Sequence, residues 1–81
     1  MREKITLMPL NQIRMILQLL DAPNQRLVVS GRSEGAIIKE LYRKGYVKPT
    51  GKIGRAIRWE LITTFISEAD IDLMRELAKN H

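Results

Sequence analysis

The first apolar residues of the chain recur at the spacing of one face of an α-helix. They come every three or four positions, and they are Leu10, Ile13, Ile16, Leu17 and Leu20. Pro9 suits an early helical position, and the run Asp21-Ala22-Pro23 marks a stop. The pattern therefore predicts a helix over residues 9–21 whose apolar stripe belongs to the core.

The next segment, PNQRLVVSG at residues 23–31, allows two structures. Pro23 can open a short helix, whereas the consecutive Leu27, Val28 and Val29 favour a short strand. A helix here would be the first half of a helix-turn-helix. The apolar run favours the strand.

A second helix is predicted over residues 32–44. Ser30 or Ser33 can cap it, its body is EGAIIKELYRK, and Gly45 stands where a left-handed residue would end it. Its apolar face holds Ile37, Ile38, Leu41 and Tyr42. Its opposite face holds Arg32, Ala36, Lys39 and Arg43. This face is a continuous stripe of three cations around one small residue.

Residues 46–62 have the alternation of a β-hairpin. Pairing Val47 with Trp59 and Pro49 with Ile57 leaves Lys52-Ile53-Gly54 as a three-residue loop. The same register sets Lys48 opposite Arg58 on the outer face, where like charges repel unless an anion lies between them. The hairpin is thus expected to have an apolar face toward the core, which includes Trp59, and a basic outer face. Two roles remain possible for Tyr46: a surface tyrosine, or a hydrogen-bond donor to a phosphate.

The last predicted helix covers residues 67–80. Ser67 followed by Asp70 has the pattern of a capping box. One apolar row holds Ile71, Met74 and Ala78, and a second holds Leu73 and Leu77. Two rows exceed what a small core needs, so we expect Leu73 and Leu77 to form a homodimer contact.

Composition reduces the number of function classes that are possible for this chain. The 81 residues suffice for one domain, residues 1–81. There is no cysteine and the single histidine is His81, so we expect no metal site, no cofactor and no enzyme activity. No apolar run approaches the length of a membrane span or of a signal-peptide core, which favours a cytoplasmic protein. Nothing indicates a small-molecule ligand.

The positive charge is concentrated in the middle of the chain. The net charge is +5, and residues 22–65 carry nine cations against three acids, a net of +6. Residues 66–81 carry two cations against four acids, a net of −2. A focused positive field attracts phosphate backbones and acidic partners.

The stretch SGRSEGAIIKELYRKGYV, followed at once by KPTGKIGRAIRWELI, resembles the winged helix-turn-helix family of transcriptional regulators. The resemblance implies an α+β winged-helix domain that binds double-stranded DNA. The helix over 32–44 would be the recognition helix in the major groove, and the hairpin over 46–62 would be the wing. The residues expected to contact DNA are Arg32, Ser33, Ala36, Lys39, Arg43, Lys48, Lys52, Arg55 and Arg58.

Each residue type suits a part of that task. Arg32 and Lys39 can read base edges through the major groove. Ser33, near the helix start, can bind a phosphate, and Ala36 allows close approach or contacts a thymine methyl. A protein-interaction module with an acidic partner and a structured-RNA-binding domain are the alternatives. The cationic stripe has no exposed apolar anchor, which argues against a protein partner.

Overall fold

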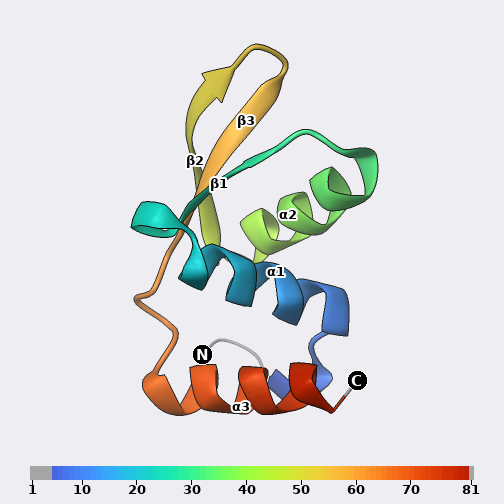
Figure 1. The fold of residues 1–81 in the computed structure, drawn as a ribbon, viewed down its shortest axis with the longest axis vertical. Helices are drawn as coiled ribbons and strands as arrows, with labels where there is room; N and C mark the ends of the chain where they lie inside the picture. The colour runs from blue at the N-terminus through green and yellow to red at the C-terminus, as the bar shows by residue number, and fades with distance from the viewer. Residues whose placement is uncertain (1–4, 81) are drawn as a thin grey trace.

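The computed structural model describes residues 5–80, and over this range the protein has an α+β fold (Figure 1). The α-helices are α1 (Leu10–Asp21), α2 (Arg32–Lys44) and α3 (Glu68–Lys79). The strands are β1 (Arg26–Val29), β2 (Val47–Ile53) and β3 (Ala56–Leu61). Two single 3-10 turns, Ile5–Leu7 and Pro23–Gln25, precede α1 and β1.

The strands form one antiparallel sheet in the order β1-β3-β2. Residues 23–31 thus contain the strand that their apolar run favours, and no α-helix precedes α2 in this segment. The chain enters β1 through Asn24 and Gln25, both in the left-handed region with φ of 56° and 57°. That conformation is uncommon outside glycine, and asparagine tolerates it better than glutamine does.

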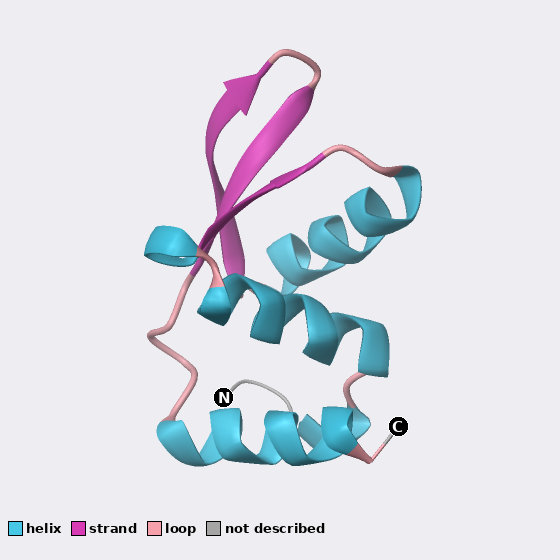
Figure 2. Cartoon of the chain, viewed as in Figure 1, coloured by secondary structure: helices cyan, strands magenta, loops and turns pink. Residues whose placement is uncertain are grey.

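The helices and the sheet are stacked about α1. On one side α1 contacts α2 and β3, and on the other it contacts α3 (Figure 1). The β2–β3 hairpin projects beyond the helices at the end farthest from α3 (Figure 2). The molecule therefore has a hairpin end and an α3 end, joined by the central helix.

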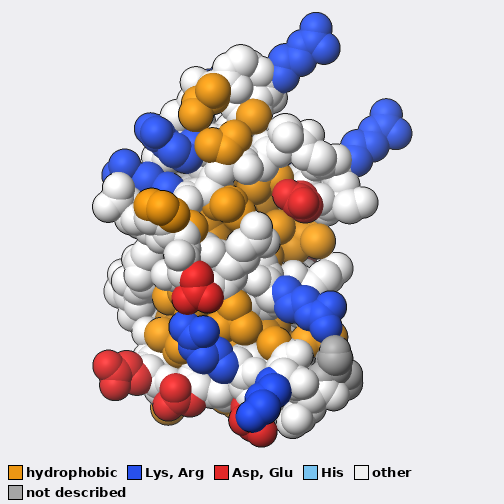
Figure 3. Space-filling view, in the orientation of Figure 1, with side chains coloured by type: hydrophobic (Ala, Val, Ile, Leu, Met, Phe, Trp, Pro, Cys, Tyr) orange, Lys and Arg blue, Asp and Glu red, His pale blue; other side chains and the backbone are white. Residues whose placement is uncertain are grey.

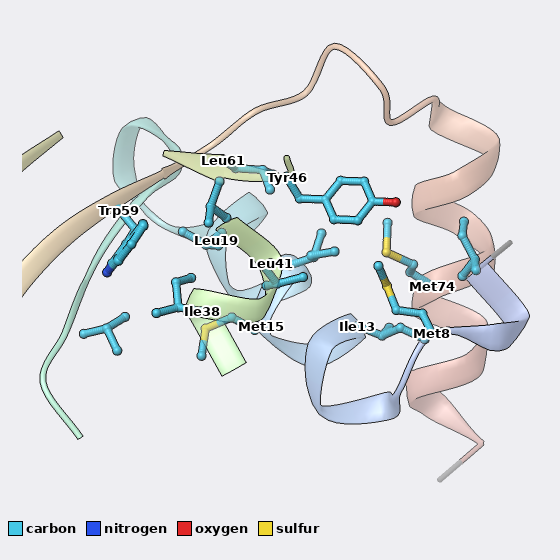
Figure 4. Packing of buried hydrophobic residues seen from close by; sticks show 14 residues of the cluster. Met8, Ile13, Met15, Leu19, Ile38, Leu41, Tyr46, Trp59, Leu61 and Met74 are labelled. Carbon is cyan, nitrogen blue, oxygen red and sulfur yellow. The ribbon is translucent and has the colours of Figure 1, made fainter. Parts of the chain in front are cut away.

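The core is continuous between these two ends. Figure 4 shows it running from Trp59 through Leu41 and Leu19 to Met74 on α3. Trp59 is 6% exposed, as its alternation with Ile57 predicts. Tyr46 is fully buried, so it is neither a surface tyrosine nor a phosphate ligand. It lies directly after the turn that ends α2, where its ring fills the space between α2 and α3 (Figure 4).

The apolar face of α2 is narrower than predicted. Ile38 and Leu41 are buried, but Tyr42 is 52% exposed. Tyr42 stands at the margin of the face, and its ring lies against that of Trp59 with the centroids 5.6 Å apart. The ring thus covers one side of the tryptophan from the surface.

The N-termini of α2 and α3 are capped differently. The capping box of α3 is present: the Asp70 N–H donates to the Ser67 hydroxyl at 3.1 Å, and the Ser67 N–H donates to the Asp70 carboxylate at 2.9 Å. At α2 the predicted Ser30 or Ser33 cap is wrong, because the N-cap residue is Gly31 and no side chain caps the helix. The other end of α2 stops at Gly45 with φ of 87°, as expected of a left-handed terminus.

Candidate nucleic-acid interface

The hairpin differs from the predicted register, and the difference decides where its cations lie. Val47 pairs with Leu61 and Pro49 with Trp59, two positions further along β3 than predicted. The turn is tighter than the predicted three-residue loop, since Ile53 already pairs with Ala56. Gly54, with φ of 60°, takes the first position of this two-residue turn, as glycine does in type II′ hairpins.

A β-bulge at Thr50 moves Lys52 to the other face of the sheet. The register shifts between Pro49 and Gly51, so that Lys52 pairs with Ile57. Cross-strand partners share a face. Lys52 therefore shares a face with Ile57, while Lys48 lies on the opposite face with Glu60. Lys52, predicted to lie in the loop, is thus part of β2 and lies on the face opposite to Lys48 and Arg58, because of one extra residue.

On the outer face of the sheet, Glu60 lies between two cations. Its carboxylate accepts a hydrogen bond from Arg26 Nε at 2.7 Å and forms an ion pair with Lys48 Nζ at 3.4 Å. The hydrogen bond from Arg26, aided by Lys48, lowers the pKa of Glu60 below its ordinary value. The predicted opposition of Lys48 and Arg58 is wrong, because the register brings Lys48 to a carboxylate instead.

Arg58 is held on the same outer face. Its Nε donates to the Thr50 hydroxyl at 3.3 Å, and the hydroxyl in turn donates to the Arg58 carbonyl oxygen at 3.3 Å. The guanidinium also lies over Gly51, where a Cβ would come within 3.2 Å of Nη2. Glycine at the bulge thus leaves room for the arginine, which is directed along β2 and away from α2.

The predicted stripe of α2 is exposed along its whole length. Arg32, Ser33, Ala36, Lys39 and Arg43 are all accessible to solvent. Arg43 forms an ion pair with Glu40 at 3.5 Å. Within residues 5–80, no ion pair is found for Arg32 or Lys39. The helix therefore presents two uncompensated cations, two turns apart, on one face.

A hollow of about 370 Å³ lies between α2 and the hairpin. Arg32 and Lys39 line it from α2, and Arg55 lines it from the turn of the hairpin. Its apolar lining includes Ile38, Ile57 and Trp59. Arg55 also has no ion pair among the residues that the structure describes. Two consecutive elements, α2 and the hairpin, thus bring three cations without acidic partners among the described residues to one concavity.

The structure gathers some of the predicted DNA-contacting residues and separates others. Arg32, Ala36, Lys39 and Arg55 line the hollow, and Lys52 stands on the same face of the sheet as its apolar lining. Lys48 and Arg58 lie on the outer face instead. The hollow itself is not predicted from the sequence. Its only sequence signal is the set of small residues at the start of α2, namely Gly31, Gly35 and Ala36.

Charge is distributed unevenly over the surface. Figure 3 shows most of the acidic side chains of that view at the α3 end, with long cationic side chains extending from the hairpin and α2 end. At the α3 end, Arg75 is joined to Asp21 of α1 at 3.3 Å. The end that carries the hollow is therefore the more positive one.

The two predicted dimer residues of α3 differ in environment. Leu73 is 40% exposed, whereas Leu77 is half-buried and packs against the core. Met74 is fully buried between them. The second apolar row of α3 is therefore partly used inside the protein, and Leu73 remains on the surface.

Comparisons with known proteins leave the site to be judged on its own geometry. No protein-family model matches the chain, and no curated protein or solved structure matches it either. Among residues 5–80, no group of three or more histidine, cysteine or acidic side chains is placed to hold a metal ion. None of the helices in that range is both long and apolar enough to span a membrane.

Proposed function

We propose that this protein binds double-stranded DNA with α2 and the β2–β3 hairpin, as a small transcriptional regulator with a winged-helix arrangement. In this proposal α2 is the recognition helix and the hairpin is the wing. Support comes from the connection between them, because α2 ends at Gly45 and β2 begins two residues later. β1 takes the place of a helix before α2, so a strand on the edge of the sheet presents the recognition helix.

The observation that carries the proposal is the convergence of Arg32, Lys39 and Arg55 on one hollow without acidic partners among the described residues. Like charges brought together by folding repel one another, and a bound anion relieves that repulsion. α2 has 13 residues, a length of roughly 20 Å, and its exposed face fits a major groove about 12 Å wide. Backbone phosphates on either side of that groove would then meet the hairpin.

The outer face of the sheet has a lesser part in this proposal. Lys48 is already paired with Glu60, and Arg58 is tied to Thr50. Arg43 shares its charge with Glu40. Arg32, Lys39, Lys52 and Arg55 are therefore the main DNA ligands, with Ser33 and Ala36 allowing the groove to approach α2.

A homodimer through α3 remains part of the proposal. Leu73 supplies the exposed apolar contact, and the surface around it lies at the end opposite the hollow. Because the molecule is 35 Å long and α3 lies at one end of that axis, such a dimer would place its two α2–hairpin surfaces at opposite ends, and each copy would contact its own segment of DNA. Sedimentation at micromolar concentration tests the dimer directly, and a monomer there would contradict it.

The test of DNA binding compares two lysines on two helices. Fluorescence anisotropy would follow a random duplex of about 30 base pairs at several salt concentrations, with Lys39→Ala and Lys79→Ala as variants. Both lysines are exposed and both substitutions remove one charge. We expect Lys39→Ala to reduce the slope of log affinity against log salt by about one, and Lys79→Ala to leave it unchanged.

Equal effects of the two variants would show attraction by net charge alone and would contradict the proposed site. No binding even at low salt would refute DNA binding and would lead to a search for an acidic protein partner. Tighter binding to a duplex RNA of the same length would identify RNA as the partner instead.

A further inference from the structure

The hollow has two kinds of wall, and a DNA duplex uses only one of them. Three cations, Arg32, Lys39 and Arg55, line it together with the apolar Ile57 and Trp59. Phosphates of a duplex can meet the cations. The apolar lining offers a phosphate no partner, and burying a charged group there without one is unfavourable. A phosphate backbone alone would leave the apolar part of the hollow unfilled.

The first turns of α2 leave that part open. At Gly35 a Cβ would meet nothing within 4 Å, and the same is true at Gly31. Gly35 does not have a positive φ, and glycine inside a helix is less stable than alanine. Neither backbone conformation nor packing therefore calls for glycine at this position. What it provides is free space beside Ala36, in the wall of the hollow.

The size of the hollow suits a small molecule. Its volume of about 370 Å³ falls in the range of small-molecule sites, which is about 300–1,000 Å³. Such sites combine a mainly apolar lining with a few polar or charged groups that orient the ligand. Here the charged groups are all cations, so the complementary ligand has an anionic head and an apolar body.

We propose that the hollow binds a small organic anion, with one carboxylate or phosphate on a flat apolar body, and that this ligand competes with DNA. The anionic head would meet Arg32, Lys39 and Arg55, and the body would lie against Ile57 and Trp59, which line the hollow. The ligand occupies the cations assigned to DNA, so the two cannot bind together. The competition rests on the proposed function, whereas binding of the anion does not.

Trp59 provides the measurement, because it is the only tryptophan of the chain and lines the hollow. Phenyl phosphate would be titrated while the tryptophan emission is followed, with inorganic phosphate and benzyl alcohol as separate stand-ins for its anionic and its aromatic part. We expect a saturable change with phenyl phosphate at a concentration at least about tenfold below that needed for either stand-in. No change up to millimolar phenyl phosphate, or equal binding of inorganic phosphate, would overturn the proposal.

Two substitutions at Gly35 separate a filled hollow from a damaged fold. Gly35→Leu places a side chain into the open space, and Gly35→Ala adds only a methyl group. Both replace glycine in a helix by a better helix former, so we expect both to unfold at denaturant concentrations no lower than wild type. Gly35→Leu should weaken phenyl phosphate binding at least about tenfold, whereas Gly35→Ala should retain most of it. Unchanged binding by Gly35→Leu would place the ligand elsewhere and refute the site.

Lys39 in the hollow and Lys79 on α3 are compared again, to test whether the cations of the hollow hold the anion. Lys39→Gln should weaken phenyl phosphate binding several-fold, and Lys79→Gln should not. In the anisotropy assay, added phenyl phosphate should raise the protein concentration needed to bind the duplex. Binding seen at Trp59 without that shift would refute the competition. If the wild-type protein binds phenyl phosphate but not the duplex, the proposed function is refuted and the anion site still stands.

Discussion

The helices α2 and α3 have nearly equal length and differ at their N-termini. α3 begins with a capping box at Ser67 and carries Glu68 and Asp70 in its first turn, where they favour the positive end of the helix dipole. Its Arg75 is paired with Asp21 of α1. The capping box, the acidic first turn and the ion pair with α1 therefore all favour α3 as a helix.

α2 lacks the side-chain cap, although Glu34 in its first turn and Arg43 and Lys44 in its last turn suit the helix dipole. Its N-cap is Gly31 without a side-chain hydrogen bond, and Gly35 follows in the first turns. Arg32 stands at the positive end of the helix dipole, where a cation is unfavourable. These weak points coincide with the hollow. Local rules of stability are often broken where a protein binds something, so the contrast with α3 adds to the case for α2 as the candidate site.

The largest expected effect is on the free energy of unfolding, when a core residue of α3 and a site residue of α2 are each replaced by alanine. Met74 of α3 is fully buried, so Met74→Ala should lower the free energy of unfolding by about 2–5 kcal/mol. Lys39→Ala on the exposed face of α2 should change it by less than about 0.5 kcal/mol. Urea denaturation of both variants measures the difference. A large loss for Lys39→Ala would mean that the α2 stripe stabilises the fold instead of binding a partner.

The helices are the part of the fold that the sequence predicts best. Each shows the 3.6-residue period with recognisable end signals, so Gly45 and the Ser67 cap appear where the local pattern puts them. Tyr46 and Tyr42 exchange their expected environments, because both stand where α2 ends and tertiary packing decides which ring is covered. Local periodicity carries no information on that choice.

The candidate site was predictable on α2 and not on the hairpin. Helical spacing alone places Arg32, Ala36 and Lys39 on one exposed face. The position of Lys52 depends on the bulge at Thr50, and a one-residue change of register transfers a side chain to the other face. The hollow depends in turn on the hairpin, since Arg55 and Ile57 line it from there. It could not be seen before the register was known.

Removing the cap of α3 should have a smaller effect than the Met74 substitution. Ser67→Ala loses the hydroxyl that accepts the Asp70 N–H, at an expected cost of about 1 kcal/mol. The equivalent loss does not exist at α2, because Gly31 has no side chain to remove. Thermal unfolding followed by circular dichroism measures the cost. An unchanged midpoint would show that α3 is held by packing alone and would weaken the contrast with α2.

The capping box also gives α3 a dependence on pH. The hydrogen bond from the Ser67 N–H lowers the pKa of Asp70. A carboxyl whose pKa is lower in the folded state contributes stability above its unfolded pKa, which is about 3.9, and this contribution is lost as the pH falls through the folded value. The stabilities of wild type and Asp70→Asn should therefore converge as the solution is acidified below about pH 4. A constant difference across that range would contradict the assignment.

A side-chain cap added to α2 should raise the stability of the protein, whereas removing the cap of α3 lowers it. The backbone of Gly31 is already extended, and a Cβ there would meet nothing within 4 Å. In Gly31→Ser the hydroxyl oxygen can therefore accept a hydrogen bond from one of the first N–H groups of α2, with an expected gain of a few tenths of a kcal/mol. The midpoint of urea unfolding measures it. A loss of stability would show that the start of α2 needs glycine for its conformation, which would remove one of the arguments for an open binding site.

The smallest effect on stability is expected on the outer face of the sheet, where charges are paired as they are at α3. Glu60→Gln removes the carboxylate between Arg26 and Lys48, and exposed ion pairs contribute little to folding. The substitution also gives the protein one more positive charge and releases Lys48. If DNA meets only α2 and the hairpin tip, the salt slope of DNA binding should stay as in wild type, in contrast to Lys39→Ala. If Lys48 contacts DNA, Glu60→Gln should bind more tightly with a steeper slope, and the interface would then extend around β2 to the face that the structure shows as neutralised.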